Sequence, residues 1–537
     1  MNKNTLLFIG LLVSICSFSQ EDAWVFFNNK PNAASYIANP LTMLSQRALD
    51  RREKQNIALD DKDVPVDINY YNQIKNATGI TVLAKSKWLN ALHIQGTESA
   101  ITNLKSNYSF IKNIEFANKS IAVSAKTTTV AKQQQKFTET ITEFNYGNAA
   151  NQIKMLHGDF LHQQGFTGSG MQIAIIDAGF TNANTLAAFQ RLRDNNQILG
   201  GYNFVNRSTN FYTGSSHGTH VLSDIGGYID GQFVGTAPDA SFYLFVSEDT
   251  SREVPLEESL WVEAAEKADS LGVDVINTSL GYTTFDNANY NYTYSDMDGK
   301  TTFISRGAEI GASRGMVLVN SVGNSGNSSW KYVGAPADAE NVLAVGAVDA
   351  SKTIANFSSY GPTVDGRVKP DVLAQGQAAY VIHYQYGTPA TANGTSFSSP
   401  ILAGVVACFW QAFPNKTHTE IVEAIKQSSD KYNTPDAHYG YGIPNFELAK
   451  QTLTISNSNN DFTNVVVYPN PATDTIHFKI NEDQSNYQLK IFSLLGEQLL
   501  STTNLSKNIA ISHLSSGIYL VQIQHKNQHK NILLVKK

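Results

Sequence analysis

The sequence predicts an α/β protein whose main domain is a doubly wound parallel sheet, with a small α+β domain before it and a small β-sandwich after it. In residues 143–452, apolar strand-like runs alternate with helical stretches, which is typical of parallel βαβ units. In residues 465–537, short strand-like runs alternate with turns, and there is no helical periodicity. The 537 residues suffice for about three to five domains.

The first 19 residues are expected to be a cleaved signal peptide. Lys3 is followed by an apolar stretch at residues 6–18, and Ser17 and Ser19 are the small residues that signal peptidase needs before Gln20. The apolar stretch is shorter than the ~20 residues that a membrane-spanning helix requires. A buried N-terminal strand is the alternative. We expect export through the Sec pathway and no transmembrane segment.

Residues 20–117 are predicted to form the small α+β domain. Alternating apolar positions predict a half-buried strand, a helix follows Thr97, and a further strand closes the domain. The positions that carry this pattern are Ile80, Val82, Ala84, Ile101, Leu104, Ile114 and Phe116. Residues 118–142 are rich in Thr, Gln and Lys and poor in large apolar residues. We expect them to form an exposed linker that is open to proteolysis.

Residues 143–452 contain the predicted parallel sheet. The predicted strands are residues 171–176, 273–276, 317–319 and 342–348, and the predicted helices are residues 260–268, 304–312 and 401–413. A polar break marks a second linker, residues 453–464. The β-sandwich follows at residues 465–537, where turn residues separate the strand-like runs.

The composition disfavours several classes of protein. The net charge is −6, and charged residues make up 16% of the chain, well below the usual ~25%. A nucleic-acid binder or a protein that binds anionic membranes needs basic patches. The two cysteines are Cys16, inside the predicted signal peptide, and Cys408. The exported chain is therefore expected to have neither an internal disulfide nor a multi-cysteine metal site.

Three segments of the main domain carry candidate catalytic residues. Asp177 ends an apolar strand, and the carboxyl ends of strands line the ligand crevice of open α/β sheets. His217 begins a His-Gly-Thr-His segment at an expected helix start, where an exposed imidazole can act as a general base. Ser396 precedes the apolar helix at residues 401–413. The dipole and free N–H groups at the start of that helix favour the negative charge that a serine's attack on a carbonyl creates.

Each of these residues has a structural alternative. Asp177 would cap a turn, Ser396 would cap a helix, and His217 would be structural or would bind a metal ion with His220. Together, Asp177, His217 and Ser396 stand in one of the chain orders known for catalytic triads, with Ser396 as nucleophile, His217 as general base and Asp177 orienting the imidazole. Asn324, in a Gly-rich turn, is a candidate oxyanion donor beside the backbone N–H of Ser396, with a plain Asn-Gly turn as the alternative.

These segments, in this order, resemble those of the subtilisin-like serine peptidases (subtilases) over residues 146–442. The resemblance implies a Ca²⁺-stabilised α/β sandwich and an endopeptidase that works through an acyl-enzyme, with no cofactor needed for the chemistry. It also implies a substrate-binding segment and a roomy pocket that suits an apolar or aromatic residue before the scissile bond. The residues concerned are Ser279, Leu280, Gly281 and Gly334.

The chain departs from the subtilase pattern where calcium would bind. The stretch between His220 and Pro238 is short where many subtilases carry a Ca²⁺ loop. Asp296 and Asp298 form an acidic turn in an unusual insertion, and this turn is either a Ca²⁺ site or a solvated loop. The sequence therefore assigns no metal ligand, and structural Ca²⁺ is an expectation from the resemblance alone.

The flanking domains also match the subtilase pattern. Subtilases commonly carry a propeptide that assists folding and blocks the active site, which is the role expected of residues 20–117, with maturation cleavage in residues 118–142. Residues 465–537 resemble the sorting domain of the type IX secretion system, through Tyr-Pro-Asn-Pro at residues 468–471, Leu-Leu-Gly at residues 494–496 and the basic end. The expected partners are protein or peptide substrates, the propeptide as intramolecular inhibitor, and the secretion machinery that carries the protein across the outer membrane.

Two other functions compete with this interpretation. Gly-x-Ser-x-Gly matches around Ser216 and Ser313 would suit an α/β-hydrolase esterase, but neither serine has a strand before it and a helix after it. A catalytically inactive subtilase fold that serves as a binding protein is the second alternative. All four chemical positions are present, so nothing in the sequence supports that loss of activity.

Overall fold

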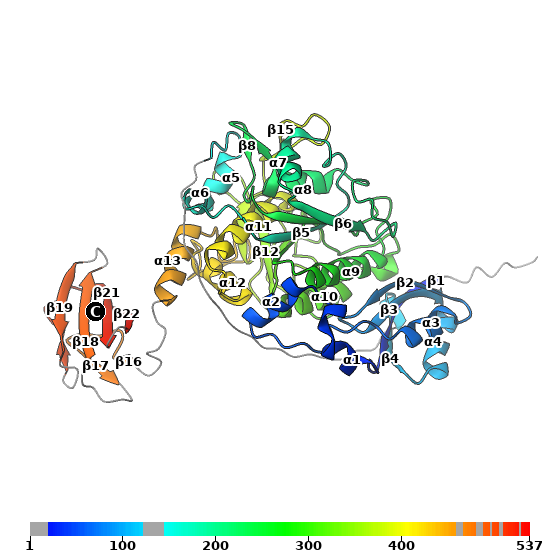
Figure 1. Ribbon diagram of the computed structural model, residues 1–537, viewed down its shortest axis with the longest axis horizontal. Helices are drawn as coiled ribbons and strands as arrows, with labels where there is room; N and C mark the ends of the chain where they lie inside the picture. Colours follow the sequence, from blue (N-terminus) through cyan, green and yellow to red (C-terminus); the bar gives the residue numbers. More distant parts are fainter. Residues whose placement is uncertain are drawn as a thin grey trace, which may run out of the picture. The chain divides into compact units, whose positions relative to one another are not determined.

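The computed structural model describes residues 20–121, 144–457, 466–479, 487–493, 497–503, 508–525 and 528–537 (Figure 1). The predicted signal peptide and residues 122–142 of the predicted linker lie outside this part of the chain. The chain divides into two compact units, Met1–Phe446 and Glu447–Lys537, and each is described by itself. Among the described residues, no helix has both the length and the apolar character needed to cross a membrane.

The first unit begins with a four-stranded antiparallel sheet in the order β2-β3-β1-β4. Its strands are β1 (Gln20–Phe27), β2 (Ile80–Ser86), β3 (Ala91–Thr97) and β4 (Ile111–Phe116). The helices of this part are α1 (Ala33–Ala38), α2 (Gln46–Lys54), α3 (Ile68–Lys75) and α4 (Glu98–Asn107), with 3-10 turns η1 (Pro40–Thr42) and η2 (Lys119–Ile121). Thr97 caps α4 by accepting the N–H of Ala100 at 3.2 Å. The predicted strand, helix and closing strand are confirmed.

The main body of the first unit is a seven-stranded sheet in the order β13-β12-β11-β10-β5-β9-β6, and all its neighbouring pairs are parallel. The strands are β5 (Gln172–Asp177), β6 (Ile198–Asn203), β9 (Ser241–Val246), β10 (Val275–Thr278), β11 (Val317–Ser321), β12 (Val342–Val348) and β13 (Val372–Gln375). This sheet confirms the predicted doubly wound α/β fold.

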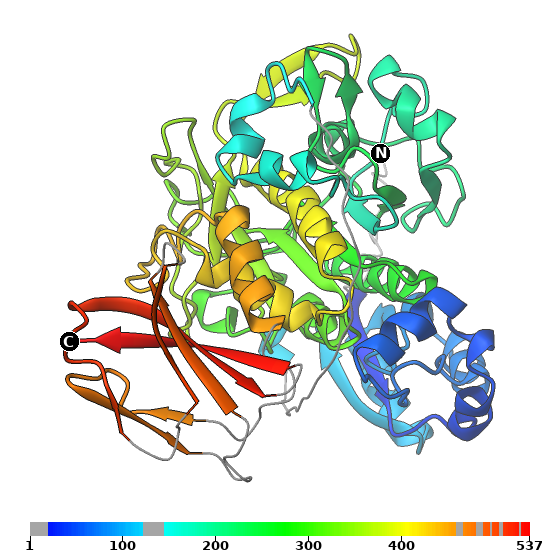
Figure 2. The same cartoon turned by 60° about the vertical axis from the view of Figure 1, so that its left-hand side comes forward.

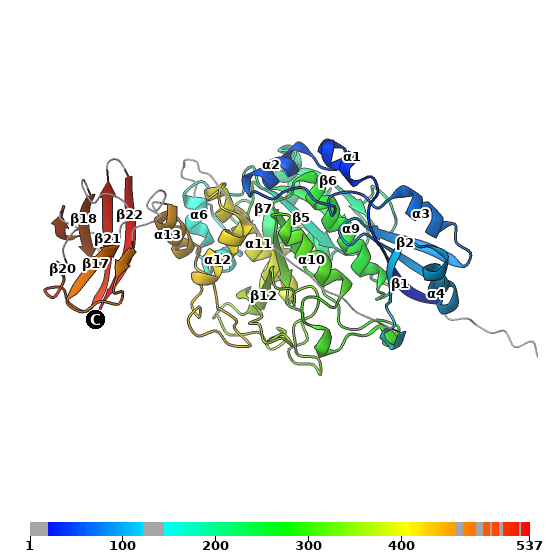
Figure 3. The ribbon, with the colours of Figure 1, turned by 90° about the horizontal axis from the view of Figure 1, so that it is seen from below.

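Helices cover both faces of the parallel sheet (Figure 2). On one face, α8 (His217–Gly226) packs against α11 (Thr395–Ala412), and on the other α9 (Leu256–Leu271) packs against α10 (Phe303–Ser313). The N-terminal sheet lies against α9 and α10 (Figure 3). Trp24 of β1 stacks on Phe303 of α10 with ring centroids 4.9 Å apart, so one hydrophobic core continues from the N-terminal domain into this helical layer.

Shorter elements surround the sheet. The helices are α5 (Ala150–Lys154), α6 (Gly158–Gln163), α7 (Gln190–Asp194) and α12 (His418–Gln427), and the 3-10 turns are η3 (Ala187–Phe189), η4 (Ala288–Tyr290) and η5 (Tyr294–Asp296). Helix α13 (Phe446–Asn457) begins at the last residue of the first unit and otherwise belongs to the second. Two hairpins pair β7 (Tyr228–Ile229) with β8 (Phe233–Val234), and β14 (Ala379–Ile382) with β15 (Pro389–Ala392).

Two predicted boundaries differ from the structure. Helix α11 begins at Thr395 instead of residue 401, so Ser396 lies in its first turn and Pro400 lies inside it. A proline normally ends or precedes a helix, which explains the late start that the sequence predicts. Helix α13 continues to Asn457, so the boundary predicted at residue 452 falls within a helix.

The second unit contains two antiparallel sheets around a core of its own. One sheet contains β16 (Val466–Tyr468), β17 (Thr475–Lys479) and β20 (Ile509–Ala510). The other contains β18 (Tyr487–Ser493), β19 (Gln498–Thr502), β21 (Gly517–His525) and β22 (Gln528–Lys536). This arrangement agrees with the predicted β-sandwich.

Candidate active site

The acid and the histidine meet where strand β5 ends and helix α8 begins. The Nδ1 atom of His217 lies 2.9 Å from Oδ1 and 3.0 Å from Oδ2 of Asp177, whose side chain is buried. The backbone N–H of Ala178 donates to Asp177 Oδ1 at 2.7 Å and fixes the carboxylate. Gly218 makes the approach possible, because a Cβ atom there would lie 2.5 Å from the carbonyl oxygen of Gly179.

The charge of Asp177 controls the titration of His217. Burial lowers the pKa of the imidazole, but the charge of Asp177 and its hydrogen bond outweigh burial and raise the pKa above its usual 6.5. Because Nδ1–H donates to the carboxylate, Nε2 is left as the basic nitrogen of the neutral ring. The pair can therefore accept a proton at Nε2.

Ser396 lies in the first turn of α11. The ring of the next residue, Phe397, is 6.0 Å from the ring of His217. The hydroxyl of Ser396 donates to the carbonyl oxygen of Ser279 at 3.3 Å, and the hydroxyl of Ser279 donates back to the carbonyl oxygen of Ser396 at 2.9 Å. The structure thus joins Asp177 to His217 directly and relates Ser396 to them through the ring of Phe397.

A buried polar network beneath Ser396 was not anticipated from the sequence. Asn277, in β10, donates from Nδ2 to Ser279 Oγ at 3.1 Å, and the hydroxyl of Ser399 in α11 donates to Asn277 Oδ1 at 2.9 Å. These bonds tie the end of a central strand to the first turn of the serine's helix. Asn277 lies outside the segments that the sequence singles out, and Ser399 occupies a variable position of the segment around Ser396, so only their spatial proximity reveals the link.

Asn324 is held by the residue that precedes the serine. Its Oδ1 atom accepts the backbone N–H of Thr395 at 2.8 Å and the Thr395 hydroxyl at 3.1 Å. Because Oδ1 takes both bonds, the amide nitrogen is the end of the side chain left for another acceptor. An Asn324 in this orientation, beside the N-terminus of α11, has the chemistry of an oxyanion donor.

A single pocket of about 520 Å³ contains both Ser396 and Asn324, together with the predicted substrate-binding residues Ser279, Leu280, Gly281 and Gly334. Thr283, Trp330 and Tyr332 also line it, and the sequence had not singled them out. The remaining lining residues are Ser321, Val322, Gly323, Ser325 and Ser359. The lining includes no charged side chain, so the pocket suits an uncharged ligand group.

Two groups of acidic residues are candidate calcium sites. Asp296 pairs with Lys119 at 2.6 Å, and Asp298 accepts backbone N–H groups of Lys300 and Thr301 at 2.8 and 2.7 Å. Both carboxylates of the predicted acidic turn are therefore engaged with protein partners, and we assign no ion to that turn.

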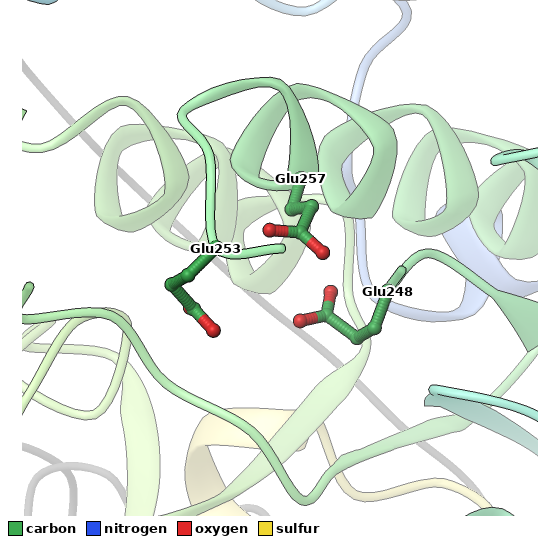
Figure 4. Close-up of side chains that lie close together, drawn as sticks. All are labelled: Glu248, Glu253 and Glu257. Carbon is green, nitrogen blue, oxygen red and sulfur yellow. The ribbon is translucent and has the colours of Figure 1, made fainter. Parts of the chain in front are cut away.

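The second group is Glu248, Glu253 and Glu257, whose oxygens converge at the start of α9 (Figure 4). Burial raises the pKa of both Glu253 and Glu257 to about 7. Both oxygens of Glu257 already accept backbone N–H groups at 2.8 Å, and Glu248 accepts the Ser247 hydroxyl at 2.9 Å. Ca²⁺ takes six to eight oxygen ligands, which this partly protonated and hydrogen-bonded group does not supply, so it too is left without an assigned ion.

Comparison with known proteins identifies the domains. The subtilase family model matches residues 168–442, about half of the chain. The chain belongs to the subtilase family. A propeptide domain of S8 peptidases from Bacteroidota matches residues 22–136, and a secretion system C-terminal sorting domain matches residues 466–537. This subtilase is therefore a secreted serine endopeptidase that is made as a zymogen, and its sorting domain indicates export by type IX secretion.

Curated relatives agree with this assignment. The subtilase is 30% identical to subtilisin DY of Bacillus licheniformis over 56% of this chain and 97% of that protein. It is 32% identical to subtilisin E of Bacillus subtilis over 56% of this chain and 70% of that protein. Among solved structures, MycP1 with its N-terminal propeptide removed matches with a TM-score of 0.44 and 24% identity, over 56% of this chain and 96% of that chain.

Proposed function

We propose that this subtilase hydrolyses peptide bonds through an Asp177-His217-Ser396 triad and an acyl-enzyme intermediate. The observation that carries the proposal is the 2.9 Å contact between His217 Nδ1 and the buried Asp177 carboxylate. Ser396 lies in the first turn of α11, and the ring of the next residue, Phe397, is 6.0 Å from the imidazole. In the reaction, Nε2 of His217 takes the hydroxyl proton while Ser396 Oγ attacks the scissile carbonyl. The same nitrogen then gives that proton to the leaving amine, and a water molecule releases the acyl group by the reverse route.

The oxyanion of the tetrahedral intermediate is received by Asn324 Nδ2 and the backbone N–H of Ser396. The bonds from Thr395 to Asn324 Oδ1 support this role, because they point the amide nitrogen of Asn324 away from Thr395. A donor of this kind typically contributes about 2.7–4 kcal/mol to the transition state. The backbone of residues 279–281 pairs with the substrate, and the uncharged pocket receives an apolar or aromatic side chain before the scissile bond.

The N-terminal domain, residues 20–117, acts as the propeptide. Its sheet covers α9 and α10 with apolar contacts and with buried ion pairs such as Arg52 with Asp269 at 2.8 Å. These contacts support a role in assembling the peptidase domain. The domain also blocks the active-site cleft until residues 118–142 are cut. Export begins with Sec-dependent removal of residues 1–19 and ends with translocation directed by residues 465–537.

A fluorophosphonate adduct tests the triad directly. The processed protein should carry the adduct on Ser396, and His217→Ala should abolish labelling because the hydroxyl loses its base. The mass of the same sample shows whether the propeptide is still attached, so a blocked cleft is distinguished from an inert site. Equal hydrolysis of casein by the wild type and by Ser396→Ala would refute the assignment and would favour the alternative of an inactive binding protein.

A further inference from the structure

Tyr332, one of two aromatic residues that line the pocket beside Ser396, contacts two other tyrosine rings. Tyr332 lines the pocket, and its ring lies 4.1 Å from that of Tyr294 at an interplanar angle of 27°. The ring of Tyr360 also lies 5.8 Å from it, at 63°. Stacked and edge-to-face rings at these distances attract one another. The Tyr332 ring is therefore held in place against the pocket.

Tyr294 belongs to the insertion that follows the substrate-binding segment, residues 279–281. Tyr294 begins η5, where Thr293 and Asp296 form a reciprocal capping box. The hydroxyl of Tyr294 donates to the carbonyl oxygen of Pro362 at 2.8 Å, and the backbone N–H of Val364 donates to the carbonyl oxygen of Met297 at 3.2 Å. The insertion is thus pinned to a neighbouring loop, and it presents the Tyr294 ring to Tyr332 as a fixed support.

The other pocket residues offer little resistance to a large side chain. Gly281, Gly323 and Gly334 have no side chain, and Trp330 packs against the hydrophobic core around α9 and α10. The backbone of Tyr332 is also fixed, because it bridges to Tyr360 and the next N–H donates to the Tyr360 carbonyl oxygen at 3.0 Å. Trp330 is held by the core, so the ring of Tyr332 is the large side chain that limits the space in the pocket.

We infer that Tyr332 limits the size of the substrate side chain that precedes the scissile bond. Tyr294 is a positioning residue, because its ring holds the Tyr332 ring in place. The inference rests on the proposed function, because it assigns a role within the same pocket. It differs from the general expectation of a roomy pocket, since it names the two residues that limit the room.

The test compares kcat/KM for peptides that differ only in the residue before the scissile bond, from Ala through Leu and Phe to Trp. Tyr332→Ala should raise the ratio of kcat/KM for the Trp peptide to that for the Ala peptide about tenfold. Discrimination by even one methylene group in an apolar pocket is typically about 10-fold or more. Tyr294→Ala should also raise the ratio, by about threefold, because the Tyr332 ring loses the ring that holds it in place. Tyr294→Phe keeps the ring and loses only the bond to Pro362, and it should keep the wild-type ratio within about twofold.

Tyr432→Ala is the matched control. Tyr432 also packs against another tyrosine, Tyr441 at 5.6 Å, but neither ring lines the pocket, so the ratio should stay at the wild-type value. A ratio is insensitive to the fraction of folded enzyme, and Tyr332→Leu is the substitute if Tyr332→Ala does not fold. An unchanged ratio in the Tyr332 variant that still takes the fluorophosphonate would overturn the inference. Loss of labelling in the wild type would instead overturn the proposed function.

Discussion

The carbonyl oxygen of Ser396, in the first turn of α11, accepts a hydrogen bond from the hydroxyl of Ser279 at 2.9 Å. In a regular helix this oxygen would accept the N–H of the residue four positions later. That residue is Pro400, which has no N–H. The Ser279 hydroxyl therefore supplies the donor that the proline lacks, and it couples the proposed substrate-binding segment to the position of Ser396, the proposed nucleophile.

Ser279→Ala should lower kcat/KM about tenfold, because a buried acceptor that loses its donor costs about 1–3 kcal/mol. Pro400→Ala alone should change the rate little, since its new N–H points at an acceptor that is already bonded. In the double variant this N–H replaces the Ser279 hydroxyl and should recover most of the lost rate. The measurement is a kinetic double-mutant cycle with one peptide substrate.

Ser313→Ala serves as the control for this cycle. Its hydroxyl bonds within α10 to the Ile310 carbonyl oxygen at 2.7 Å, so its loss should leave the rate unchanged. The same variant tests the esterase alternative, in which Ser313 would be the nucleophile. Additive effects of Ser279→Ala and Pro400→Ala, without recovery, would show that the two residues do not share the Ser396 carbonyl.

The activity should fall on the acid side at a pH above that expected for an ordinary histidine. His217 must be neutral to act as a base, and the Asp177 carboxylate raises its pKa above 6.5. Lowering the pH through this raised pKa protonates the ring and removes the base, so the acid limb of kcat/KM should have its midpoint above 6.5. Asp177→Asn should shift the midpoint below 6.5, because burial then acts alone, and should lower kcat about 10⁴-fold. A midpoint that does not move in this variant would contradict the assigned pair.

Much of this molecule could be predicted from local patterns, and the exceptions share a physical cause. Asp177, His217 and Ser396 each sit in a short segment whose residue types reveal a strand end or a helix start. Tyr294 and Tyr332 have no such signal, because their stacking depends on how an insertion folds back against a distant loop. The sequence predicts too late a start for α11, because proline is normally excluded from the interior of a helix. The Ser279 hydroxyl that compensates for the missing N–H of Pro400 comes from a distant part of the sequence.

Removing Arg52 should weaken the attachment of the N-terminal domain. Arg52 is buried and pairs at 2.8 Å with both Asp63 and Asp269, and the charges of Arg52, Lys87 and Arg51 outweigh burial and lower the pKa of Asp269 to about 2. Arg52→Met leaves two buried carboxylates short of a partner and should cost about 3 kcal/mol of unfolding free energy, the lower end of the usual range because Arg51 and Lys87 remain.

The measurement for Arg52 is urea unfolding of the full chain carrying Ser396→Ala, so that the linker stays intact. Lys62→Met is the control. It breaks a pair with Asp60 at 3.5 Å in which both side chains are about 40% exposed, and such pairs contribute less than ~1 kcal/mol. Equal unfolding free energies for the two variants would show that the buried pair does not stabilise the assembled zymogen.

Raising the pH above about 4 should destabilise the fold through Asp224, a buried carboxyl group in α8. Burial raises its pKa well above the usual 3.8, and its nearest donor is Gln152 Nε2 at 3.4 Å. The folded state therefore keeps a proton that the unfolded state releases, so stability is complete below pH ~3.8 and falls as the pH rises toward the raised pKa. Asp224→Asn keeps an acceptor for Gln152 and cannot ionise, so it should raise the melting temperature at pH 8 and flatten the pH dependence above pH ~4. The exposed Asp230→Asn is the matched control and should leave the slope unchanged, and an Asp224→Asn protein with the wild-type slope would show that this carboxyl does not hold its proton in the folded state.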